Sequence, residues 1–287
     1  MRSSLYPWII AAVAVLIAAS AGLLMLNQMP AAPADDGAAD AAAALIRVQS
    51  EITVALETLD GRLSRAAAEI GRTGLTDDAA RAILTDLSAT DPAIIDCSIV
   101  DAEGTLIAIE PVYHDTEGAD LRDQPNVQHI LASKRPIMSD MIMLAEGFPS
   151  VLISTPIFTE ESQFVGFSSL VFRPEALIAD IAGPVERETP FAVMVIQRDG
   201  HVLYETDATQ IGRMTFEDPL YEDILDVARQ ITAERYGTAA YGFTDGKERV
   251  ITWTTVGIHG VEWRVAVIRD AGAAVYQTAD NRIAPVE

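Results

Sequence analysis

The sequence predicts an α+β fold in which one long N-terminal helix precedes two tandem modules, each built on an antiparallel sheet. A hairpin pattern that occurs twice carries this prediction. The strand IIDCSIV leads into the turn Asp101–Gly104, and the strand FAVMVI leads into the turn Gln197–Gly200. Each copy continues with a helical stretch and further alternating strands. The duplication therefore predicts two similar modules rather than one large one.

The composition limits the classes of function. The chain has 287 residues, of which 49% are hydrophobic, and this is enough for two modest cores. Its 42 acidic and 20 basic residues give a net charge of −22, spread along the whole sequence. A field of this sign repels nucleic acid and anionic lipid headgroups, so neither is an expected partner. We interpret the acidity as a solvated surface rather than as a cation site.

Residues 1–27 are predicted to be a transmembrane anchor or a signal segment. The charge-free run Ile9–Leu26 is nineteen residues long when Trp8 is added, close to the roughly twenty that span a bilayer. A-x-A patterns at 19–21 and 32–34 leave cleavage open, and cleavage would give a secreted protein. One basic residue before the span and acidic residues after it predict a single-pass protein with its bulk extracellular or periplasmic.

Residues 28–40 are rich in Pro, Ala and Asp and are predicted to be a linker. In residues 41–90, apolar side chains from Leu45 to Ile70 recur at steps of three or four, which predicts a long helix, with a short second helix after Gly74. This stripe packs against the core. Its N-terminal half is equally compatible with a coiled coil with another chain, which would give a homodimer through the long helix.

Residues 91–183 form the first predicted module and residues 184–270 the second, before a polar tail at 271–287. In the first module, a strand near 136–143 and a connecting helix that ends at Gly183-Pro184 are expected. In the second, a helix is expected around 220–234. Cys97, Trp253 and Trp263 are predicted to be buried core residues. The other strands of the two modules are expected at 150–158, 164–172, 237–243, 249–256 and 262–268.

Several segments, taken in order, resemble one known family. GADLRDQPNVQHILASKRPIMSD has a glycine loop, a short helix and a strand, and STPIFTEESQFVGFSSLVF has a closing hairpin. DGHVLYETDATQIG and VEWRVAVI then follow in the second copy. These segments resemble the double Cache domain, the PAS-like extracellular sensor of many prokaryotic chemoreceptors and histidine kinases. The resemblance covers about Ala38 to Asp270.

The resemblance implies that a small organic ligand binds the first, membrane-distal module, between its sheet and the loop–helix segment. Amino-acid sensors of the family carry an Arg-Pro-Trp run where this chain has Gln124-Pro125-Asn126. The aspartate expected on the final strand falls near Val171. Amino acids are therefore not the expected ligand. The candidate ligand-binding residues are Tyr113, Arg122, Gln124, Asn126, His129, Ser139 and Asp140.

Five of the seven candidates also have a plainer interpretation. Arg122 either clamps a carboxylate with its planar fork or pairs with a neighbouring aspartate at the surface. Gln124 and Asn126 either offer a donor and an acceptor to a ligand or are simply solvated. Asp140 lines the pocket or caps a turn, and Tyr113 contacts the ligand or packs in the core or at its rim.

No catalytic pattern is present, so an enzyme is not expected. The four histidines lack metal-ligand spacing, and the sequence has neither a nucleophile elbow nor a glycine-rich phosphate loop. No metal and no cofactor are predicted. The preferred hypothesis is a membrane-anchored sensor without its own output domain, which acts through a receptor or histidine kinase. The alternatives are a solute-scavenging protein that feeds a transporter and a surface adhesion or structural subunit.

Overall fold

The computed structural model describes residues 36–111, 113–143, 149–242 and 246–271. The predicted N-terminal anchor and nearly all of the predicted polar tail lie outside these residues. Across the described ranges, no helix combines the length and the apolar character that crossing a bilayer requires.

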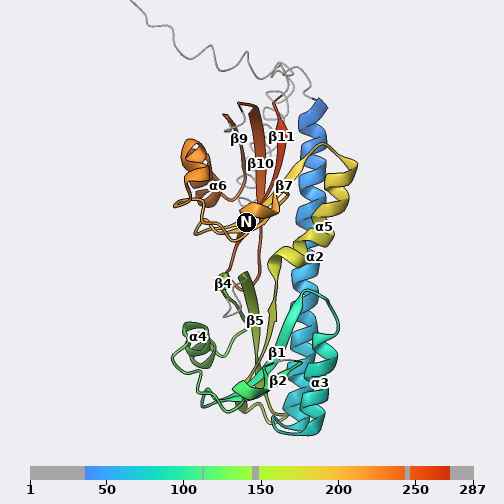
Figure 1. Cartoon of the computed structure of the whole chain (residues 1–287). Helices are drawn as coiled ribbons and strands as arrows, with labels where there is room; N and C mark the ends of the chain where they lie inside the picture. Colours follow the sequence, from blue (N-terminus) through green and yellow to red (C-terminus); the bar gives the residue numbers. More distant parts are fainter. Residues whose placement is uncertain (1–35, 112, 144–148, 243–245, 272–287) are drawn as a thin grey trace, which may run out of the picture. The chain divides into compact units, whose positions relative to one another are not determined.

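A single long helix, α2 (Asp36–Thr73), runs alongside both sheets (Figure 1). It begins within the segment predicted to be a linker and continues past Gly71. Each side chain of its apolar stripe is at most 6% exposed. The stripe belongs to one hydrophobic core together with side chains from strands of both modules, so the chain itself covers the stripe. Core packing therefore holds along the whole stripe, and a homodimer through the long helix stays a prediction. The stripe consists of Leu45, Val48, Ile52, Leu56, Leu59, Leu63, Ala66 and Ile70.

The first module has an antiparallel sheet in the order β2-β1-β6-β5-β3, with β4 also paired to β5. Helix α3 packs on the side of this sheet that faces α2, and α4 lies on the opposite side (Figure 1). The elements are α3 (Asp78–Ser88), β1 (Ile94–Asp101), β2 (Leu106–Glu110), η1 (His114–Thr116), α4 (Pro125–Ser133), β3 (Ile137–Met138), β4 (Ile142–Met143), β5 (Pro149–Phe158) and β6 (Phe164–Phe172).

The second module has the order β8-β7-β11-β10-β9, so its strands follow the same path as those of the first. The turn glycines Gly104 and Gly200 have φ of 86° and 102°, which other residues rarely adopt. The predicted duplication and the α+β fold class are confirmed. The elements are β7 (Ala192–Gln197), β8 (Val202–Glu205), η2 (Ala208–Gln210), η3 (Pro219–Ile224), α6 (Leu225–Ala233), β9 (Gly237–Gly242), β10 (Glu248–Val256) and β11 (Trp263–Asp270).

Three local predictions are wrong. Helix α5 (Pro174–Glu188) does not end at Gly183-Pro184 but continues through it. Proline removes one helical hydrogen bond, and the burial of Ala182 and Val185 on either side compensates. The expected helix at 220–234 is a 3₁₀ segment followed by α6. The strand expected at 136–143 is divided into β3 and β4.

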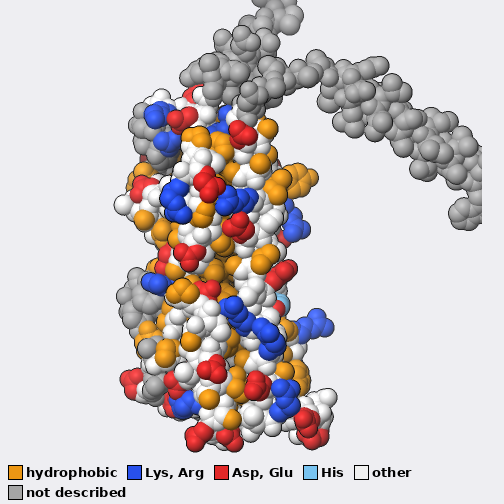
Figure 2. All heavy atoms as spheres, turned by 90° about the vertical axis from the view of Figure 1, so that its right-hand side faces the viewer, with side chains coloured by type: hydrophobic (Ala, Val, Ile, Leu, Met, Phe, Trp, Pro, Cys, Tyr) orange, Lys and Arg blue, Asp and Glu red, His pale blue; other side chains and the backbone are white. Residues whose placement is uncertain are grey.

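The buried side chains form three clusters. The largest lies between the helices α2, α3 and α5 and the inner faces of both sheets, and it includes Cys97 and Trp263. Smaller clusters lie under α4 and under η3 and α6, the latter with Trp253. All three of these residues are at most 1% exposed, as predicted. On the face that carries α2, α3 and α5, side chains of both charges are interspersed, so acidic residues form no single patch there (Figure 2).

Candidate functional site

A groove lies where α4 and the segment 137–142 of the first module meet the β10–β11 turn of the second. It encloses about 1060 Å³ free of protein atoms, part of it open to solvent. Four of the seven predicted ligand-binding residues line it. They are Asn126, His129, Ser139 and Asp140.

Helix α4 supplies Asn126 and His129. Pro125 begins the helix, at a position where its fixed φ and missing N–H carry no penalty. Val127 and Ile130 point to the apolar cluster and are at most 2% exposed. Asn126 and His129 are three residues apart and therefore neighbours on another helix face, the one that lines the groove.

Ser139 and Asp140 line the groove, and the segment Ser139–Met141, called its floor below, is held from two sides. The Ser139 backbone N–H donates to the Leu152 carbonyl over 2.9 Å, and the Leu152 N–H donates to Ser139 Oγ over 3.1 Å. The Met141 N–H donates instead to Oε1 of Gln197, in the second module, over 2.8 Å. Because this amide is bound by the other module, the predicted continuous strand is interrupted.

Asp140 lies close to charged groups of the second module. Partial burial of its carboxyl raises its pKa, the neighbouring Asp199 raises it further, and His201 opposes the rise. Asp199 in turn contacts His201 Nδ1 at 2.9 Å and accepts from the buried Gln197 side chain. The carboxylate of Asp140 is thus poorly compensated, and a ligand group that donates hydrogen bonds or carries positive charge would stabilise it.

The structure does not bring the other three candidates into the groove. The Arg122 guanidinium pairs with Asp120, with Nε 2.9 Å from Oδ1, and its side chain is 66% exposed. This hydrogen-bonded pair lowers the pKa of Asp120 to about 2. Gln124 is exposed at the start of α4, and Tyr113 packs against the apolar cluster under that helix.

Residues of the second module complete the groove, and sequence reasoning missed them. His259, Gly260 and Val261 come from the β10–β11 turn. His259 has a φ of 52°, and its Nε2 lies 2.7 Å from Oδ1 of Asp60 on α2. The sequence carried no signal for this contact, since 199 positions separate the two residues.

A second missed feature is a row of buried hydroxyls across the first sheet. Ser98, Ser169 and Ser154 are direct cross-strand partners on β1, β6 and β5, and each is at most 8% exposed. Ser154 Oγ and Ser169 Oγ are 2.7 Å apart. Val100 is two residues after Ser98, and Phe167 is two residues before Ser169, so each points to the same face of the sheet as its serine. Both belong to the cluster under α4, and the row of hydroxyls therefore lies on the α4 side of the sheet. Ser154 pairs with Ile137, which lines the groove, and this places the hydroxyls beside it.

Comparisons with known proteins bear on the family and on the fold. Residues 54–174 match the family of HK/GC/chemotaxis protein-like sensor domains, a range that covers the second half of α2 and the first module. An extracellular ligand binding receptor from Desulfohalobium retbaense is similar over 78% of this chain, with 26% identity and a TM-score of 0.67. The match covers 39% of that receptor, so this chain spans well under half its length.

Two further structures share the fold at lower identity. The ligand-binding domain of a Pseudomonas fluorescens chemoreceptor in complex with L-isoleucine has 18% identity and a TM-score of 0.60, over 80% of this chain and 90% of its own. The extracellular domain of rpHK1S-Z16, described as a histidine kinase, has 15% identity and a TM-score of 0.62, over 86% and 99%. No curated protein sequence matches the chain.

Fold and matches together define the class of protein. The chain has a double Cache fold, which it shares with extracellular ligand-binding domains of chemoreceptors and histidine kinases, and its residues 54–174 match the sensor-domain family. The predicted resemblance is confirmed.

Proposed function

We propose that this chain is an extracellular or periplasmic sensor module that binds a small organic ligand in the groove between α4 and the β10–β11 turn, and that residues 1–27 anchor it in the membrane. One observation carries the proposal: the groove is lined by residues of both modules. A molecule bound there touches Asn126, His129 and Asp140 on one side and the His259 turn on the other.

Ligand binding would act through differential affinity for two arrangements of the groove. The β10–β11 turn contacts α2 through the His259–Asp60 pair, and the floor of the groove contacts the second module through Gln197. A ligand that draws α4 and the turn together therefore favours one position of the turn against α2. The long helix is the element through which a receptor or histidine kinase partner would sense this change. No catalytic step is part of the proposal.

The groove favours a polar ligand with at least one hydrogen-bond donor or positive charge directed at Asp140. Asn126 offers a donor and an acceptor, and His129 offers a ring nitrogen. The Pseudomonas fluorescens domain binds L-isoleucine, but here the Arg-Pro-Trp run of amino-acid sensors is replaced and Arg122 is engaged by Asp120. We therefore favour amines and neutral polar compounds over amino acids at this site.

A thermal-shift screen of the full chain tests the proposal. A ligand that binds only the folded protein stabilises it by about 2.7 kcal/mol at a concentration of about 100 Kd. Asp140→Ala should remove the shift, whereas Arg122→Ala, outside the groove on the same module, should keep it and serves as the matched control. A hit whose shift survives Asp140→Ala and His129→Ala would refute this placement of the site. No hit among amines, carboxylates, purines and sugars would favour the adhesion alternative, and a co-purified transporter would favour the scavenging one.

A further inference from the structure

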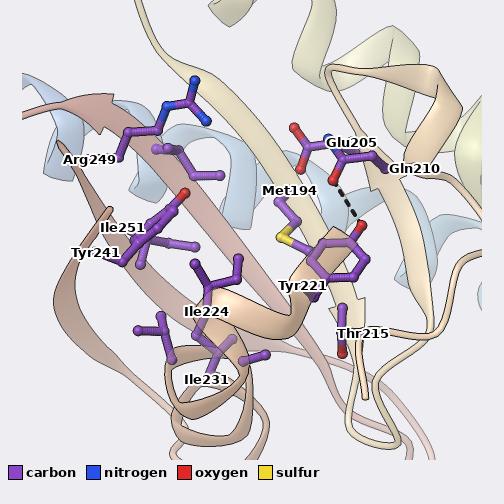
Figure 3. Close-up of a pocket in the computed structure, with 13 residues that line it drawn as sticks. Met194, Glu205, Gln210, Thr215, Tyr221, Ile224, Ile231, Tyr241, Arg249 and Ile251 are labelled. Carbon is purple, nitrogen blue, oxygen red and sulfur yellow. Dashed lines mark hydrogen bonds between the residues drawn. The ribbon is translucent and has the colours of Figure 1, made fainter. Parts of the chain in front are cut away.

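The second module contains a pocket on the side of its sheet that carries η3 and α6. It lies between the sheet and the segment formed by η3 and α6, and it encloses about 510 Å³ free of protein atoms, part of it open to solvent. Figure 3 shows Glu205, Gln210 and the Tyr221 hydroxyl close together on one side and Arg249 on the other. Ile224, Ile231 and Ile251 supply apolar wall around them (Figure 3).

The strand register identifies the matching position in the first module. Both hairpins have a shift in strand register next to the turn. Beyond this shift, Ser98 pairs with Ile109 in the first hairpin, and Met194 pairs with Glu205 at the same position of the second. Glu205 therefore occupies the place of Ile109, which is packed in the apolar cluster under α4. The duplication has put a carboxyl where its counterpart has a hydrocarbon side chain.

Glu205 is 7% exposed and lines the cavity. The backbone N–H groups of Thr206 and Asp207 donate to its carboxyl, and no cationic side chain of the described residues forms a salt bridge with it. Burial raises its pKa to about 8, and the neighbouring Asp207 and Glu186 add to the rise. A buried carboxyl without a counter-charge is destabilised when ionised, so in the empty cavity it is held mostly protonated at neutral pH.

Other charged groups around Glu205 do not supply that counter-charge. Arg249 Nε lies 3.9 Å from Oδ1 of Asp270 on the neighbouring strand. Arg213 pairs with Asp218, with Nη1 2.6 Å from Oδ2. Arg269 on β11 lines an adjoining pocket together with Glu205, but no salt bridge between the two is found among the described residues. The other groups near Glu205 are acidic or neutral: Glu186 on α5, Asp207, the phenols Tyr204 and Tyr221, and Gln210, whose Oε1 accepts from the Tyr221 hydroxyl over 2.8 Å.

We propose that this cavity is a second binding site, for a small aliphatic primary amine whose ammonium pairs with Glu205 and whose hydrocarbon part lies among the isoleucines. The cavity shares Glu205, Gln210 and Arg249 with an adjoining, more polar pocket of about 740 Å³, part of it open to solvent. The ammonium group can reach Glu205 from solvent through this polar pocket. The site is independent of the groove between the modules.

Binding has a defined proton balance. The ammonium enters with its charge, and Glu205 releases one proton to solvent as it becomes the counter-ion. Between about pH 6 and pH 8 the affinity should therefore rise about tenfold per pH unit, and it should level off above pH 8.

Calorimetry and thermal shift of the full chain test this site with three probes of similar shape: isopentylamine, isovalerate and leucine. Isopentylamine should raise the melting temperature and release about one proton at pH 6.5, measured in two buffers of different ionisation enthalpy. The neutral isostere Glu205→Gln should weaken its binding at least tenfold. Asp140→Ala should leave it unchanged, which separates this site from the groove.

Three results would overturn the assignment. The first is no response to isopentylamine at millimolar concentration at pH 8. The second is unchanged amine binding in Glu205→Gln, provided that this variant melts cooperatively. The third is stabilisation by isovalerate or leucine equal to or greater than that by the amine, because either would place a carboxylate-binding group in the cavity.

Discussion

The two modules have the same strand order but fill the space between sheet and helix differently. In the first, Ile109, Val127, Ile130 and Phe167 pack α4 onto the sheet, and the polar residues lie at the edge, in a groove shared with the second module. In the second, η3 and α6 stand over a cavity that contains the buried carboxyl of Glu205. The two modules thus differ at one register position, where the first has the hydrocarbon side chain of Ile109 and the second has the carboxyl of Glu205.

The largest effect on stability should come from placing the glutamate of the second module at the matching position of the first. Ile109→Glu would put a carboxyl among the buried side chains of Val127, Ile130 and Phe167. We expect a loss of unfolding free energy on the order of 3–5 kcal/mol at pH 7, because the charge must be buried or the cluster opened. Urea denaturation measures it, with Ile46→Glu on the 62%-exposed position of α2 as control. A loss below about 1 kcal/mol would mean that the first module accommodates a carboxyl at this position as the second does.

The next effect concerns the carboxyl of the second module and depends on pH. The folded-state pKa of Glu205, about 8, is above its ordinary value of 4.5, so the folded state binds more protons between these two values. Stability should therefore fall as pH rises from about 4.5 to 8 and level off beyond. Glu205→Gln removes this dependence, and at pH 8 it should stabilise the protein by on the order of 2–4 kcal/mol, with little change at pH 4.5.

Thermal unfolding from pH 4.5 to pH 9 checks this pH dependence. Parallel curves for the wild type and Glu205→Gln would show that Glu205 is solvated and that the cavity is open there. Glu222→Gln, at an exposed glutamate of the same module, is the control and should melt as the wild type does at each pH.

The smallest effect compares matching isoleucines under the two helices. Ile130→Ala removes a fully buried side chain from a packed cluster and should destabilise by about 3 kcal/mol. Ile224→Ala acts on a half-buried residue that already faces a cavity, and should destabilise by about 1 kcal/mol. Chemical denaturation of both variants measures the difference. Equal losses of unfolding free energy in the two variants would contradict the contrast between a packed position and one that lines a pocket.

Much of the fold was predictable because it rests on local patterns. The repeated hairpin, the apolar stripe of α2 and the alternating strands predicted two similar modules behind one helix, and the buried Trp253 and Trp263 followed from their strands. The continuation of α5 through Pro184 was not predictable in this way. It depends on Ala182 and Val185 being buried against other elements, which outweighs a local helix-breaking signal.

The site was less predictable because its contacts are long-range. The four candidates that line the groove, Asn126, His129, Ser139 and Asp140, were predicted from the family resemblance, since they lie on the loop–helix–strand segment that it covers. The contribution of His259 depends on the packing of the second module, and the Met141–Gln197 hydrogen bond joins residues 56 positions apart. Glu205 ends a short strand in the sequence, and only the packing of η3 and α6 shows that it is buried.

The account depends most on the claim that one ligand contacts both modules in the groove. Hydrogen–deuterium exchange of the full chain tests this claim directly. It is measured with and without a compound whose thermal shift is lost in Asp140→Ala. Slower exchange is predicted both in residues 125–142 and in residues 257–261 when the compound is bound. Protection confined to the first module, with the β10–β11 turn unchanged, would contradict the account.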